Sequence, residues 1–156
     1  MTYKFCDERQ VDIIKVGITK QSFSIYFSGG EIWIEHLDAL NDETELRQKF
    51  AQDMLQISKP STSAFIAVNL DETTVDKYIL QLILDSFITS EKQLRKVVFV
   101  GLNSIMKRYI KQQRPNVIFA LECIDDFEKA KIWLIGKDEN KCWERQHKKL
   151  WVPCGE

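Results

Sequence analysis

The stretch AFIAVNLDETTVDKYILQLILDSF (64–87), with its continuation to Leu134, decides the fold of this chain. Three apolar runs, over 64–70, 96–102 and 116–120, alternate with segments in which apolar residues recur at helical spacing. Strands that alternate with helices favour parallel pairing, because each helix carries the chain back to the start of the next strand. This stretch therefore predicts an α/β domain.

Polar residues mark the places where these helices begin. Thr73 or Thr74 is predicted to cap the helix after the first run, since a hydroxyl can accept from the free amides of a first turn. Asp125 with Glu128 has the spacing of a capping box before the last helix. A proline breaks the chain between these helices, so the third strand is expected over Val117–Ala120.

The chain before this stretch alternates apolar and polar residues with a period of two, over 13–18, 23–27 and 32–34. Gly29-Gly30 separates the last two runs, and glycine supplies the positive φ that tight hairpin turns require. Two or three antiparallel strands are predicted here. With the parallel part, they predict a mixed, largely parallel sheet of about four or five strands covered by helices.

A further helix is predicted between the hairpin and Pro60. Asn41 or Asp42 can cap it, and its inner face is an apolar stripe at helical spacing. The stripe consists of Leu46, Phe50, Met54 and Ile57.

Composition narrows the class of protein. The 156 residues suffice for one domain, with 44% hydrophobic and 29% charged residues and a net charge of -1. No overall field favours nucleic acid or an anionic membrane. No apolar run is long enough for a transmembrane helix or a secretory signal, so a cytoplasmic protein without a transmembrane segment is expected.

We divide the chain into an N-terminal arm over 1–12, one α/β domain over 13–135 and a C-terminal tail over 136–156. The tail contains Trp143 and Trp151, whose large apolar area favours packing on the domain or on a partner.

The cysteines favour reduced thiols over a metal site. No CxxC pair is present, and a site built from Cys142, His147 and Cys154, completed by Cys6, matches no standard zinc spacing.

Familiar catalytic motifs are absent, including GxGxxG, the Walker loop, GxSxG and HExxH. Asp71, Glu72 and Asp76 follow a strand and could bind a divalent cation through their oxygens, but acids also suit the first turn of a helix. We therefore expect no metal, no cofactor and no enzyme activity. A small metal-dependent enzyme that uses these three acids stays as a third alternative.

The order of these motifs resembles a STAS domain, the fold of bacterial anti-sigma-factor antagonists. The resemblance covers roughly residues 13–134 and is carried by AFIAVNLDETTVDKYIL, VVFVGLNSIMKRYI and DDFEKAKIWL. It implies a STAS-like domain that docks a protein partner, with no nucleic acid involved. The partner it implies is a kinase-like or anti-sigma regulator, and a homodimer is left open.

The chain departs from that family at the signature turn, which reads approximately Asp-Ser-Ser/Thr-Gly-Leu. Asp76 matches the acid, but Lys77 stands at the position of the phosphoacceptor serine, and Tyr78 and Ile79 follow without the glycine. Lysine does not accept a phosphoryl group as serine does. The resemblance thus implies a non-enzymatic interaction module of bacterial signalling that has lost its phosphoacceptor.

Asp76, Lys77 and Tyr78 are the partner-binding residues that this resemblance implies. The competing interpretation is an apolar small molecule or lipid held in a pocket like those of the related STAS/SEC14-like folds, which requires an apolar cavity of a few hundred cubic ångströms, on the order of other ligand pockets.

Overall fold

The computed structural model describes residues 20–136. The arm over 1–12, the strand expected over 13–18 and the tail from residue 137 onward lie outside the described residues, as do the two tail tryptophans and the cysteine–histidine set.

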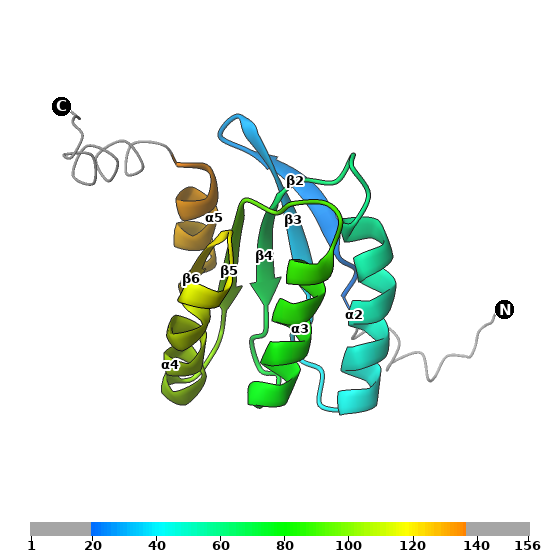
Figure 1. The fold of residues 1–156 in the computed structure, drawn as a ribbon, viewed down its shortest axis with the longest axis vertical. Helices are drawn as coiled ribbons and strands as arrows, with labels where there is room; N and C mark the ends of the chain where they lie inside the picture. Colours follow the sequence, from blue (N-terminus) through cyan, green and yellow to red (C-terminus); the bar gives the residue numbers. More distant parts are fainter. Residues whose placement is uncertain (1–19, 137–156) are drawn as a thin grey trace, which may run out of the picture.

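The described residues form one mixed sheet with helices on both faces (Figure 1). In chain order the elements are β2 (Phe23–Phe27), β3 (Gly30–His36), α2 (Glu43–Ile57), β4 (Phe65–Asn69), α3 (Lys77–Thr89), β5 (Lys96–Val100), α4 (Ser104–Gln113), a 3₁₀ turn (Arg114–Asn116), β6 (Ala120–Cys123) and α5 (Phe127–Ile135).

The sheet has five described strands in the order β2-β3-β4-β5-β6. β2 and β3 pair antiparallel, and every later pair is parallel. The predicted α/β class and the largely parallel sheet are therefore confirmed. The β2–β3 turn forms where expected, with Gly29 at φ +86°.

Helices α2, α3 and α4 cover one face of the sheet, and α5 covers the other (Figure 1). Successive residues of a strand point to opposite faces of the sheet and so pack against different helices. In β4, Ile66 and Val68 face the layer of α2, α3 and α4, and Ala67 faces α5. Both layers are closed to water, which explains why β4 and β5 read as continuous apolar runs.

The start of α3 differs from the sequence prediction. Its N-cap is Asp76, whose side chain accepts from the amides of Tyr78 and Ile79, so neither Thr73 nor Thr74 is the cap. Thr73 is engaged elsewhere, because its hydroxyl donates to the carbonyl of Leu37 at 2.6 Å.

The last strand and helix also begin later than predicted. β6 runs over Ala120–Cys123 rather than 117–120: residues 117–119 connect the 3₁₀ turn over Arg114–Asn116 to the first paired residue, Ala120, opposite Lys96. The cap of α5 is Asp126, not Asp125, which instead pairs with Lys107.

Within residues 20–136, no helix is both long and apolar enough to span a bilayer.

Candidate functional site

The candidate site lies at the edge of the sheet where the parallel strands end. Helices α2, α3 and α4 all begin at this edge, at the lower end of the view in Figure 1. In open α/β sheets this is the edge at which ligands bind, since loops there lie over the carboxyl ends of the strands. We call it the carboxyl edge.

Two contacts hold the loops of the carboxyl edge together. The amide of Leu40 donates to the Thr73 hydroxyl at 3.3 Å, so Thr73 joins the loop after β3 to the loop after β4. Gly101, at φ +94°, brings β5 against the same loop: a Cβ at this position would clash with Oδ1 of Asp71. These contacts fix the segment that leads into α3.

Asp76, Lys77 and Tyr78 form the first turn of α3. Oδ1 of Asp76 accepts from the amide of Ile79 at 3.0 Å, so this carboxylate caps the helix. Tyr78 is 67% exposed, and Nζ of Lys77 lies 5.4 Å from the centre of its ring, within range of a cation–π contact. The turn thus presents an aromatic ring and a cation to solvent from a rigid helix end.

A pocket of about 200 Å³ lies beside this turn, between the starts of α2 and α3. Leu40, Leu46 and Ile79 form an apolar floor, and Asp42 and Asp76 stand at its rim. A second hollow of about 430 Å³, between the starts of α3 and α4, is lined in part by Thr73, Gly101 and Asn103.

The three acids considered for a metal do not form a metal site. Asp76 caps α3, while Asp71 and Glu72 are exposed in the preceding loop. In the described part of the chain, no three His, Cys, Asp or Glu side chains are grouped so that they could hold a metal ion.

Sequence reasoning missed a buried acid, Glu35, which lies on β3 beside Trp33 and is 0% exposed. Burial first, and then a hydrogen bond with Asp53 of α2, raise its pKa to about 9. No N–H or O–H group of the described residues reaches its Oε2, so the proton that stays on this carboxyl can be donated to Asp53. In the sequence, Glu35 can be recognised as an acid at a position of the strand whose side chain points into the core.

The partner of Glu35 belongs to a compact polar cluster of Ser22, Lys49 and Asp53. Nζ of Lys49 lies 2.7 Å from Oδ2 of Asp53, and the Ser22 hydroxyl donates to the same oxygen at 2.9 Å. Burial by itself raises the pKa of Asp53, but hydrogen bonds from Glu35, Lys49 and Ser22 outweigh it and hold the pKa below its usual value.

The Ser22 hydroxyl is not a free nucleophile. It also accepts from Nζ of Lys49 and from the amide of His36, both at 2.8 Å, so its donor and both lone pairs are engaged. The cluster ties the entry into β2 to α2. Its contacts support a structural role.

Another buried acid, Asp38, accepts from Nδ1 of His36 at 2.9 Å and from Lys20 at 3.0 Å. Burial by itself raises the pKa of Asp38, but these hydrogen bonds outweigh it and hold the pKa below its usual value. Asp38 is thus a paired carboxylate that stabilises the loop after β3.

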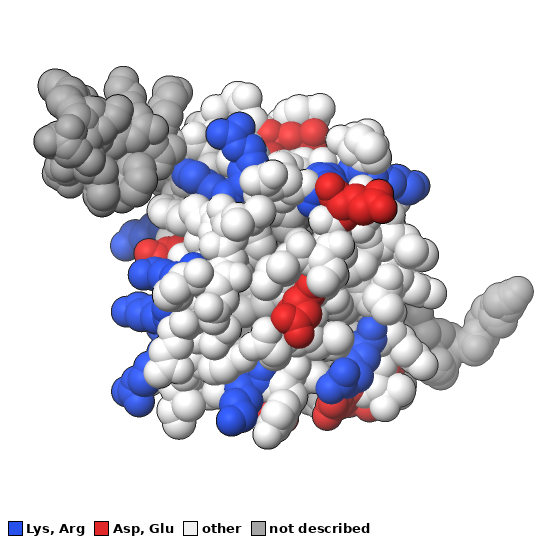
Figure 2. All heavy atoms as spheres, in the orientation of Figure 1, with Lys and Arg blue, Asp and Glu red and all other residues white. Residues whose placement is uncertain are grey.

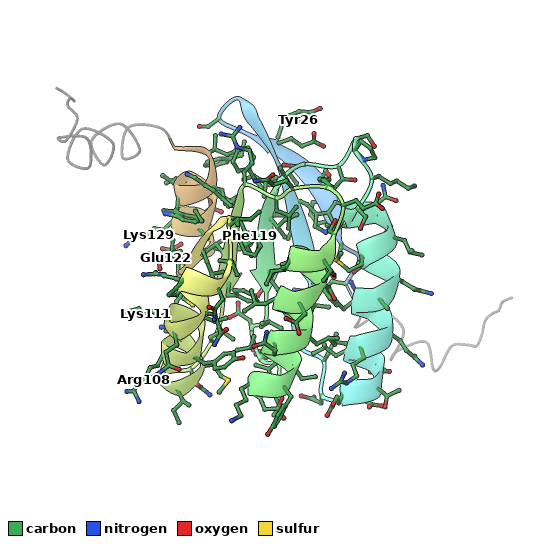
Figure 3. All side chains as sticks on the ribbon, viewed as in Figure 1. Tyr26, Arg108, Lys111, Phe119, Glu122 and Lys129 are labelled. Atoms are coloured by element: carbon green, nitrogen blue, oxygen red, sulfur yellow. The ribbon has the colours of Figure 1, made fainter. Side chains whose placement is uncertain are left out.

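Charge is unevenly distributed over the surface. Arg108, Lys111 and Lys129 lie in a column along the β6 flank, where Lys and Arg gather (Figures 2 and 3). Among the described residues these three side chains have no ion pair. The start of α2 instead carries the exposed acids Asp42, Glu43 and Glu45, of which Glu43 is paired with Arg47.

Comparisons of the chain with protein-family models, with curated proteins and with solved structures find no match. The fold and the site therefore define its class only as an α/β domain with a mixed sheet, an exposed aromatic turn and an acidic edge.

Proposed function

We propose that this chain is a non-enzymatic protein-interaction module whose docking surface is the first turn of α3, and that it is a STAS-like module of signalling. The observation that carries the proposal is the exposure of Tyr78, 67%, at the start of a helix that is otherwise well packed. Aromatic residues are enriched in interfaces because they bury a large area at little cost in side-chain entropy.

The surroundings of Tyr78 support docking rather than catalysis. Lys77 lies over its ring, and Ile105 in the first turn of α4 adds a second exposed apolar side chain, 65% exposed, at the same edge. Asp76 uses its carboxylate for capping. A rigid edge with exposed aromatic, aliphatic and cationic groups is suited to a protein surface.

The STAS resemblance adds the location of the surface and a departure from the family. The position equivalent to the phosphoacceptor is Lys77, which has no hydroxyl. In this proposal the partner is therefore bound without a phosphorylation step at that position.

A pull-down with the tagged full chain from its native host, followed by mass spectrometry, tests the proposal. Lys77→Glu and Tyr78→Ala should each abolish capture of the partner while Tm changes little, since both side chains are exposed. Lys59→Glu makes the same charge change at an exposed position beyond the far end of α2 and should capture the partner normally.

The outcome that refutes the docking assignment is a partner that Lys77→Glu and Tyr78→Ala still capture as well as the parent chain does. Loss of capture in Lys59→Glu as well would point to a nonspecific effect of charge and would count against it too.

The alternative of an apolar or lipid ligand has one observation in its favour, a groove of about 480 Å³ between α2 and α3 that includes Met54 and Leu82. Ser58, Ser86 and Arg47 also line this groove, so its walls are partly polar. Docking at α3 is the better supported of the two.

A further inference from the structure

The pocket between the starts of α2 and α3 combines an apolar floor with an anionic rim. Leu40, Leu46 and Ile79 of the floor are almost fully buried, and the cavity measures about 200 Å³. The rim carboxylates, Asp42 and Asp76, are exposed. A ligand that fits must therefore offer apolar length and end in a polar group.

Each rim carboxylate uses one oxygen and leaves the other available. Oδ1 of Asp42 accepts from the amide of Thr44 at 2.9 Å, and Oδ1 of Asp76 accepts from the amide of Tyr78 at 3.1 Å. Within residues 20–136 neither Oδ2 has a hydrogen-bond partner. Two acceptors are thus presented from two separate helices over one cavity.

The charge around the pocket selects for a cation. Glu45, Asp71 and Glu72 are exposed at the same edge. The nearby cations each have another contact: Arg47 is bound to Glu43 at 2.8 Å, Lys20 to Asp38 at 3.0 Å, and Lys77 lies over the ring of Tyr78. The positive ends of α2 and α3 act against a cation, but each is already matched by its own cap carboxylate. An anionic side chain would be repelled here, and a purely aliphatic one would gain no bond from the rim carboxylates.

We propose that this pocket receives a single arginine side chain of the protein partner. The inference rests on the proposed function, because the pocket borders the turn of Tyr78. Arginine has an apolar stem that can cover the floor and a planar head with several donors, which can bridge carboxylates on two helices. Lysine, a compact charge, matches two separated acceptors less well.

The experiment uses the ¹⁵N-labelled full chain and N-acetyl-arginine methylamide as the probe, followed by NMR. Saturable shifts should be confined to the amides of residues 40–46 and 74–79. The double variant Asp42→Asn/Asp76→Asn should weaken binding at least about fivefold, because charge-assisted bonds become neutral ones. Asparagine is as good an N-cap as aspartate, so both helices keep their caps.

The control variant Asp85→Asn/Asp126→Asn makes the same change in net charge and also alters one helix cap, that of α5. It should bind the arginine probe as the parent chain does. The lysine analogue of the probe should bind more weakly than the arginine probe. The norleucine analogue should show no detectable binding.

Equal binding of the arginine probe to the two double variants would overturn the inference, as would lysine or norleucine analogues that bind as tightly as arginine. These outcomes are separate from a failure of the proposed function. If the arginine probe does not bind but Lys77→Glu still abolishes capture, the inference alone is wrong. If the probe binds as expected but capture is indifferent to Lys77→Glu and Tyr78→Ala, the docking assignment is wrong.

Discussion

Nε1 of Trp33 donates a hydrogen bond of 2.9 Å to Oε1 of Glu35, two residues along the same buried strand. Both side chains face the layer of α2, where Asp53 approaches the other end of the carboxyl group. Burial and the contact with Asp53 raise the pKa of Glu35 to about 9. The folded chain therefore carries this carboxyl in its protonated form at neutral pH.

Glu35→Gln is expected to stabilise the chain at neutral and alkaline pH. Between pH 4.5, the ordinary value, and about 9, the folded chain holds a proton that the unfolded chain has lost, so the free energy of unfolding falls as pH rises through this window. Glutamine needs no proton and can still accept from Trp33 and donate to Asp53.

At pH 8 the Glu35→Gln variant should gain at least about 1 kcal/mol, since each pKa unit corresponds to about 1.4 kcal/mol. The gain should shrink toward zero by pH 4, where the carboxyl is largely protonated in both states. Urea unfolding followed by tryptophan fluorescence at pH 4, 6 and 8 measures this. A variant less stable than the parent at pH 8 would contradict the protonation state assigned to Glu35.

Lys92→Met is expected to destabilise the chain by about 2–3 kcal/mol, because several carbonyl oxygens lose a charged donor. The three N–H groups of Lys92 are shared among four carbonyls, those of Ile57 (2.8 Å), Lys59 (3.1 Å), Thr62 and Ser63 (3.1 Å), and so hold the end of α2 and the loop after it. Tm by calorimetry checks the loss. A Tm unchanged by Lys92→Met would show that these hydrogen bonds stabilise the fold no more than hydrogen bonds from water to the same carbonyls do.

Gly101→Ala should cost more stability than Gly29→Ala, although both glycines have a positive φ. At Gly101 the new Cβ would lie 2.7 Å from the amide nitrogen of Asp71, whereas nothing lies within 4 Å at Gly29. Gly29→Ala should cost about 1 kcal/mol from backbone conformation alone, and Gly101→Ala clearly more. Chemical denaturation of the two variants side by side measures both losses of stability. Equal losses would mean that the loop of Asp71 moves away from the new Cβ at no cost in free energy.

Substitutions of Asp76 should separate capping from charge. Asp76→Ala removes the acceptor for the amides of Tyr78 and Ile79 and should cost about 1 kcal/mol, while Asp76→Asn should cost far less. Thermal melts of both variants test the assignment. Should Thr73 or Thr74 be the true cap, Asp76→Ala would leave Tm unchanged.

The α/β fold could be predicted because its signals are local. The apolar runs of β4 and β5, the Gly29-Gly30 turn and the stripe of α2 are each formed by residues close together in sequence. Two helix starts were harder, since several capping residues stand close together. Which of Thr73, Thr74 and Asp76 caps α3 depends on Thr73 being engaged by the loop after β3, a contact between distant segments.

The sequence by itself determined the alternation of strands and helices, because periodicity and turn residues act over a few positions. It placed the cap of α3 at Thr73 or Thr74, earlier than the observed Asp76. Tertiary structure alone decided which groups meet. Glu35 is neutral because β3 and α2 bury it against Asp53, and the acid-rimmed pocket exists because Asp42 and Asp76 begin neighbouring helices at one edge. Burial and proximity between distant segments are properties of packing, and packing sets the pKa of a group and the shape of a site.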